Sequence, residues 1–228
     1  MKCIGNLFRL TAVAVCGTVF LTGCSLFKTE DVVVGYETEN YNQNIYQDSL
    51  FASELCVADG DVSMDGAPDT SGLHAAALFD VNGAKVDFAY QMFDKLYPAS
   101  TTKIMTALLA IEYGDLSQKV TVSEAASSTS FAADESVCEI KTGDVLTLKD
   151  LLYGLLMCSG NDAAVAIAET VSGSVDEFVD LMNERAQELM ATQTHFENPH
   201  GLHSENHYTT AYDLYLIFNE CIKHDEFL

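Results

Sequence analysis

The chain has 228 residues, of which 48% are hydrophobic, so it can form one domain with a buried core beside a targeting segment. It carries 34 acidic and 11 basic residues, a formal net charge of -23. Nucleic acids and anionic lipids are bound by clustered Lys and Arg, so this charge excludes a nucleic-acid partner and reversible electrostatic attachment to a membrane. Any link to a membrane must then be hydrophobic or covalent.

The first 23 residues resemble a secretory signal peptide. Lys2 and Arg9 form a short basic region, and the apolar run that follows at residues 10–21 is shorter than the ~20 residues of a membrane-spanning helix. The run ends in Leu21-Thr22-Gly23-Cys24, which is similar to the lipobox of bacterial lipoproteins, where the cysteine is lipidated. We expect Cys24 to anchor the protein at the extracytoplasmic face of a bacterial cell membrane. The alternative, an uncleaved signal anchor, places the rest of the chain on the same side.

The tether and the first strands come next. Residues 25–49 are acidic, rich in Asn and Tyr, and lack periodicity, which predicts a solvated tether (with Cys24, residues 24–49) before a domain at residues 50–228. Two apolar runs, at residues 75–79 and 85–90, flank an Asn82-Gly83 pair that favours a hairpin turn.

The remaining elements are mostly helical. Hydrophobic periodicity and flanking Gly and Pro predict a strand at residues 120–123 and helices at residues 101–113, 148–157, 162–171, 175–190 and 210–222. Few strands with many helices favour an α+β fold, in which a mainly helical region packs on an antiparallel sheet.

Ser100 and Lys103 are candidate catalytic residues. A serine hydroxyl is a weak nucleophile until a base takes its proton, and a spacing of three places both side chains on one face of a helix that begins at Ser100. The helix is apolar on nearly every side, so burial should lower the pKa of Lys103 and favour its neutral amine. The helix dipole at Ser100 would also favour a developing oxyanion.

Ser159-Gly160-Asn161 breaks the chain between two apolar helices, where its side chains could face a cleft. The simpler alternative is that Ser159 and Asn161 only cap the helix that follows. The patterns are short, and Ser25 to Lys28 and Ser204-Glu205-Asn206 repeat them in less favourable contexts.

Four segments resemble, in the same order, the low-molecular-mass penicillin-binding proteins that are serine-type D-Ala-D-Ala carboxypeptidases. Such proteins pair an SxxK motif with a later Ser-x-Asn and a Lys-Thr-Gly motif. The resemblance covers residues 50–228 and rests on the segments at residues 97–107, 151–164, 198–202 and 207–214. It implies a DD-peptidase/β-lactamase-like fold.

The resemblance also implies roles. Ser100 would attack the carbonyl of the penultimate D-Ala of a peptidoglycan stem peptide, and Lys103 would be the general base. Ser159 would relay a proton to the departing D-Ala, and Asn161 would orient Lys103 and the substrate. β-Lactam antibiotics would acylate Ser100, and no cofactor or metal is implied.

One feature departs from this pattern. In the family, Lys-Thr-Gly follows the Ser-x-Asn motif, whereas Lys141-Thr142-Gly143 precedes Ser159. We interpret this match as a coincidence and the catalytic domain as incomplete, with its late sheet strands missing. The chain by itself is therefore expected to be inactive, and the complete gene product active.

Other interpretations remain. Glu197 lacks the Asn four residues later that a class A β-lactamase would carry, yet a β-lactamase of this fold or a non-catalytic binder of muropeptides or antibiotics stays open. A zinc site at His200, His203, His207 and Glu205 is disfavoured, because Pro199 and Gly201 interrupt any helix that would align them. Cysteines in an exported protein can pair, but the spacing selects no pair among Cys56, Cys138, Cys158 and Cys221.

Overall fold

The computed structural model describes residues 52–228, and the expected signal peptide, Cys24 and the tether lie outside these residues. Within the described residues, Glu54–Leu228 form one unit. No helix in this part of the chain has the length and hydrophobicity needed to cross a bilayer.

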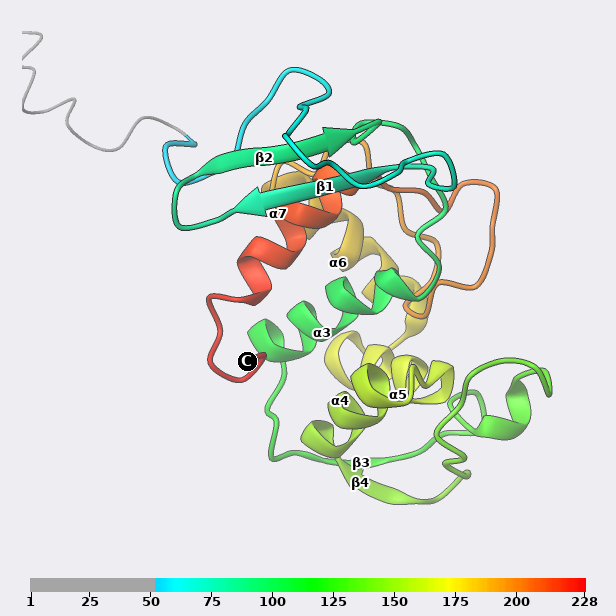
Figure 1. The fold of residues 1–228 in the computed structure, drawn as a ribbon. Coiled ribbons are helices and arrows are strands. Elements are labelled where there is room, and N and C mark those ends of the chain that lie inside the picture. Colours follow the sequence, from blue (N-terminus) through cyan, green and yellow to red (C-terminus); the bar gives the residue numbers. More distant parts are fainter. Residues whose placement is uncertain (1–51) are drawn as a thin grey trace, which may run out of the picture. The chain divides into compact units, whose positions relative to one another are not determined.

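A β-hairpin forms one layer of the fold. Strands β1 (Ala76–Asp80) and β2 (Lys85–Tyr90) pair antiparallel, as the sequence predicts. The Asp80 carboxylate accepts hydrogen bonds from the Asn82 and Gly83 N–H groups, which fixes the turn. Helix α7 (Ala211–Cys221) lies against this hairpin (Figure 1), where the Tyr215 ring stacks on Phe79 with ring centroids 4.1 Å apart.

The second layer is a group of helices around α3 (Thr102–Tyr113), which lies between α7 and the helices α4 (Leu148–Met157) and α5 (Asn161–Ser172). Helix α6 (Val175–Glu188) packs against α5. Because α3 contacts helices on several sides, most of its residues from Thr102 to Ala110 are buried, including Lys103. The predicted helices are confirmed to within a few residues.

A second small sheet was only half predicted. Strands β3 (Lys119–Thr121) and β4 (Val145–Thr147) pair antiparallel beside α4. Strand β3 begins one residue before the predicted strand at residues 120–123, and β4 was not predicted, because a three-residue strand shows no period of its own. Two short 3₁₀ turns complete the described elements, η1 (Ala99–Thr101) before α3 and η2 (Ser128–Ser130) after β3.

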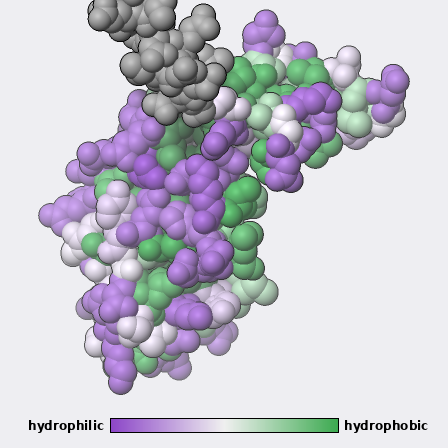
Figure 2. All heavy atoms as spheres, turned by 90° about the vertical axis from the view of Figure 1, so that its left-hand side faces the viewer, coloured by the Kyte–Doolittle hydropathy of each residue, from purple (hydrophilic) through white to green (hydrophobic). Residues whose placement is uncertain are grey.

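The face shown in Figure 2 is mostly hydrophilic, but hydrophobic side chains gather along its right-hand edge. Exposed hydrophobic residues include Leu78 on β1 and Phe218 on α7. A groove bordered by β1, α3 and α7 has an apolar lining that includes Phe79, Ile104 and Phe218.

Candidate active site

Ser100 and Lys103 lie at the start of the central helix. Ser100 is exposed in the 3₁₀ turn η1, directly before α3, so its backbone lies at the positive end of the helix dipole. Lys103 is in the first turn of α3, and only 3% of its surface is exposed. Its Nζ is 3.5 Å from Ser100 Oγ. The structure therefore brings the Ser100 hydroxyl and the Lys103 amine together.

Two further oxygens hold the Lys103 amine. Its Nζ donates to Asn161 Oδ1 at 2.8 Å and to the His200 carbonyl at 2.7 Å. A neutral amine has two N–H donors and one lone pair. Once the two donors are used on these oxygens, the lone pair is left for the direction of Ser100 Oγ, which is the arrangement a general base needs.

Burial lowers the pKa of Lys103 to about 8, from the 10.5 of an ordinary lysine. The ammonium loses hydration in this position, and neither Asn161 nor the His200 carbonyl carries a compensating charge. At pH 7 the neutral fraction is then about one tenth, which is roughly 300-fold above that of an unperturbed lysine.

Ser159 and Asn161 face Ser100 and Lys103 from the connection between α4 and α5. Ser159 Oγ donates to Ser100 Oγ at 3.0 Å, and its backbone adopts a left-handed φ of +54°. Such a conformation is costly for a non-glycine residue and re-aims the side chain. Gly160 is the N-cap of α5, and no side chain caps that helix. The alternative that Ser159 and Asn161 only cap α5 is therefore wrong.

The loop at residues 198–201 closes the site around the first turn of α3. Pro199 accepts a hydrogen bond from Thr106 Oγ1 at 2.6 Å, next to the bond from Lys103 to the His200 carbonyl. Gly201 has a φ of +90°, and a Cβ there would overlap the Ala99 carbonyl oxygen. Sequence reasoning did not assign this loop a role at Lys103, because the contacts are made by backbone carbonyls; only the family-like string at residues 198–202 pointed to it.

His207 forms a hydrogen bond with Thr102 in the first turn of α3. Its Nδ1 accepts the Glu197 N–H at 3.0 Å, so the proton is on Nε2, which donates to Thr102 Oγ1 at 2.8 Å. Burial lowers the pKa of His207 to about 4. The pKa of His200 is also lowered to about 4, through burial first and the nearby Lys103 charge second. Both rings are therefore neutral at pH 7.

A buried aspartate orders the other side of the Ser159 turn. The Asp162 carboxylate is fully buried and accepts N–H bonds from Cys138, Ile140 and Ala163. The Asn161 N–H in turn donates to the Ser136 carbonyl at 2.8 Å. These bonds fix the backbone from which the Asn161 side chain reaches Lys103.

The remaining sequence candidates lie apart from this arrangement or have other partners. Lys141-Thr142-Gly143 is an exposed turn before β4. The Glu197 carboxylate accepts a hydrogen bond from Ser204. The rings of His200 and His207 are engaged in hydrogen bonds to backbone N–H groups, and the His203 ring contacts Tyr97 edge-on.

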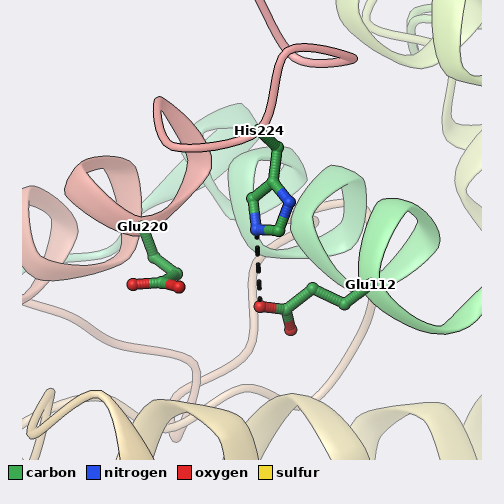
Figure 3. A group of neighbouring side chains, drawn as sticks. All are labelled: Glu112, Glu220 and His224. Carbon is green, nitrogen blue, oxygen red and sulfur yellow. Dashed lines mark ion pairs between the residues drawn. The ribbon is translucent and has the colours of Figure 1, made fainter.

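Among residues 52–228, one trio brings three possible metal-ligating atoms within 4.8 Å of one another, namely Glu112, Glu220 and His224. Figure 3 shows the His224 ring directed at the Glu112 carboxylate, with Nε2 3.7 Å from Oε1. Arg185 donates two hydrogen bonds to Glu112, at 3.0 and 2.7 Å, and lies 3.6 Å from Glu220. Because Arg185 pairs with both carboxylates and Lys223 pairs with Glu220 as well, we interpret the cluster as an ion-pair network that joins α3, α6 and α7.

Comparison with known proteins identifies the family of the chain. A sequence model of the D-alanyl-D-alanine carboxypeptidase family (Peptidase_S11) matches residues 64–227. The chain belongs to this family. The D-alanyl-D-alanine carboxypeptidase DacF of Bacillus subtilis is 41% identical over 156 residues, which are 66% of this chain and 39% of DacF.

Solved structures of family members have the same fold. Penicillin binding protein 6B from Escherichia coli superposes with a TM-score of 0.64 at 31% identity, covering 74% of this chain and 56% of that one. Penicillin binding protein 5 from Haemophilus influenzae gives a TM-score of 0.64 at 33% identity, covering 69% of this chain and 47% of that one. The expected penicillin-binding-protein fold is confirmed. The chain spans less than half the length of the carboxypeptidases DacF of Bacillus subtilis and DacD of Escherichia coli.

Proposed function

We propose that the complete protein is a serine-type D-Ala-D-Ala carboxypeptidase that removes the terminal D-Ala from peptidoglycan stem peptides. The observation that carries this proposal is the Lys103 amine, which is buried, has a pKa of about 8 and lies 3.5 Å from the exposed Ser100 hydroxyl. Membership of the D-alanyl-D-alanine carboxypeptidase family supports the substrate class.

The reaction follows from the contacts of the four side chains. The neutral Lys103 amine takes the proton of Ser100, whose Oγ attacks the carbonyl of the penultimate D-Ala and forms a tetrahedral intermediate. Ser159 Oγ, 3.0 Å from Ser100 Oγ, relays this proton from the Lys103 ammonium to the nitrogen of the departing D-Ala, so that Lys103 is neutral again and Ser159 keeps its hydroxyl. Asn161 keeps the Lys103 amine in place through its Oδ1. Water then hydrolyses the acyl-enzyme and returns the hydroxyl to Ser100.

The same nucleophile explains a second class of ligand. A β-lactam presents a strained amide to Ser100, and its opening leaves a stable acyl-enzyme. Turnover of β-lactams would need a base for the deacylating water, and the β-lactamase candidate Glu197 is engaged with Ser204. We therefore favour a carboxypeptidase that β-lactams inhibit over a β-lactamase.

We also propose that the protein is a lipoprotein held at the extracytoplasmic face of the membrane by lipid on Cys24. The signal-like residues 1–23 and the lipobox-like Leu21-Thr22-Gly23-Cys24 support this proposal. Radiolabelled fatty acid should be incorporated in cells that express the protein, and the variant Cys24→Ala should lose the label. Label that survives in Cys24→Ala would contradict the proposal.

The activity is tested on the complete gene product with a peptide that ends in D-Ala-D-Ala. Release of D-Ala should be at least about 100-fold faster than penicillin turnover, and Ser100→Ala should abolish it. Faster turnover of penicillin than of peptide would assign a β-lactamase. Tight binding of the peptide with no release from the wild type would assign a non-catalytic binder.

A further inference from the structure

Two cysteines lie beside the Ser159 turn. Cys158 is the C-cap of α4 and directly precedes Ser159. Cys138 comes from the segment between η2 and β4, and its sulfur lies against Gly154 and Gly160, where a Cβ on Gly154 would be only 2.7 Å away. Burial, the Asp162 charge and the neighbouring Cys158 thiol all raise the pKa of the Cys138 thiol. The two glycines leave the space in which the Cys138 sulfur packs against the turn that carries Cys158.

The backbone holds both cysteines in place. The Cys138 N–H donates to both oxygens of the buried Asp162 carboxylate, at 2.8 and 2.9 Å. The Cys158 N–H donates to the Gly154 carbonyl at 3.1 Å, and Gly160 shares that carbonyl at 3.2 Å. Hydrogen bonds therefore order both backbone segments that carry these thiols.

The pair is also the accessible one among the cysteines that the structure describes. All four are free thiols; Cys158 is exposed and Cys138 half-buried, whereas Cys56 and Cys221 are fully buried. Reagents in solution can therefore reach Cys158 first and Cys138 through it.

We propose that Cys138 and Cys158 form a redox-active thiol pair that closes into an intramolecular disulfide in the presence of a disulfide oxidant such as oxidised glutathione. The Cys158 thiolate attacks one sulfur of the oxidant, forming a mixed disulfide and releasing one glutathione. Cys138 then attacks Cys158 Sγ and releases the second glutathione. Two protein thiols are oxidised, one glutathione disulfide is reduced, and the two protons end on the glutathione thiols.

This order follows from the environments of the two sulfurs. Burial, and then the neighbouring Asp162 charge, raise the pKa of Cys138 to about 12, which makes it the poorer first nucleophile. The bond would close a loop of about 20 residues and tie the segment after η2 to the turn that carries Ser159. This thiol chemistry does not depend on the proposed peptidase activity, so the two proposals can fail separately.

Peptide mapping tests the proposal on the unmodified full chain. The protein is incubated with oxidised glutathione, free thiols are alkylated, and the protein is digested with trypsin without reduction. Trypsin cleaves after Lys141 and Lys149, so Cys138 and Cys158 fall in different peptides. Mass spectrometry should detect these two peptides joined by a disulfide as the main product. A stable glutathione adduct on Cys158, an alkylated Cys158, or a bond from either cysteine to another one would overturn the proposal.

Two variants and a thermal measurement serve as controls. Cys138→Ala should stop at the glutathione adduct on Cys158, and Cys158→Ser should leave Cys138 as an alkylated thiol. Oxidation of the wild type should raise its unfolding midpoint by roughly 5–10 °C, reversibly with dithiothreitol, because the cross-link restricts the unfolded chain. An equal rise in either variant would contradict the pairing. The wild-type comparison stands even if a variant folds poorly.

Discussion

The variant Asn161→Asp tests whether Lys103 acts as the base. Asn161 Oδ1 lies 2.8 Å from Lys103 Nζ, so the substitution places a negative charge beside the amine with almost no change in shape. An opposite charge at this distance stabilises the ammonium and raises the pKa of a lysine by about 1–3 units. From the starting pKa of about 8, a rise of one to two units lowers the neutral fraction at pH 7 by roughly 10–100-fold.

The assay is the rate of acylation by benzylpenicillin between pH 6 and 10, measured on the complete gene product. For the wild type, the rate should rise about tenfold per pH unit below 8 and level off above it, because it follows the neutral amine. In Asn161→Asp the midpoint should move to about 9–10 and the rate should partly recover at high pH. The control Asn161→Ala loses the hydrogen bond without adding charge, so its midpoint should stay below 9. An unmoved midpoint in Asn161→Asp would refute the role of Lys103 as base.

Three further predictions concern the surroundings of the site. Gly201→Ala should destabilise the protein by about 2–4 kcal/mol and slow acylation, because a Cβ there meets the Ala99 carbonyl. The matched control is Gly143→Ala, where φ is a similar +87° but the space is open. This control should lose about 1 kcal/mol of stability and leave acylation unchanged. Urea unfolding measures the difference, and equal losses would contradict the packing argument. Asp162→Asn should lower the free energy of unfolding by about 1–3 kcal/mol, because an amide NH₂ replaces one carboxylate oxygen and faces backbone N–H groups. The control Asp180→Asn, at an exposed position, should change the free energy of unfolding by less than about 0.5 kcal/mol. Similar values for both variants would show that the buried carboxylate is not needed. Finally, His207 stays neutral in the folded protein down to pH about 4, whereas in the unfolded chain it takes up a proton below its ordinary pKa of 6.5. The free energy of unfolding should therefore fall by up to about 3 kcal/mol as the pH drops from 6.5 to 4. His207→Gln should remove that part of the slope in denaturant titrations, and an unchanged slope would contradict this assignment.

The helices and the hairpin could be predicted because each carries its own signal. The run at residues 101–113 is apolar on nearly every side, which indicates a helix in the middle of a domain, and the structure surrounds α3 with other elements. The Asn82-Gly83 pair marked the hairpin turn. The start of α4 also carries a signal in the sequence, because Thr147 and Asp150 form a capping box.

The parts that were missed depend on contacts between distant segments. The His200 carbonyl reaches Lys103 across 97 residues of sequence, and a backbone oxygen has no residue type to recognise. The left-handed φ of Ser159 has no residue type that would announce it in the sequence, and the packing of the Cys138 sulfur against the turn after α4 depends on Gly154 and Gly160. The spacing of Ser100 and Lys103, by contrast, belongs to one helical turn, which is why the sequence alone could predict their pairing.

Mass spectrometry of the complete protein after treatment with benzylpenicillin is the most direct measurement of the central proposal. We expect one acyl adduct, on the peptide that contains Ser100, and in Lys103→Met we expect the rate of its formation to fall by at least about 100-fold. An adduct on another residue, or an unchanged rate without the lysine, would contradict a mechanism in which the buried amine activates this serine.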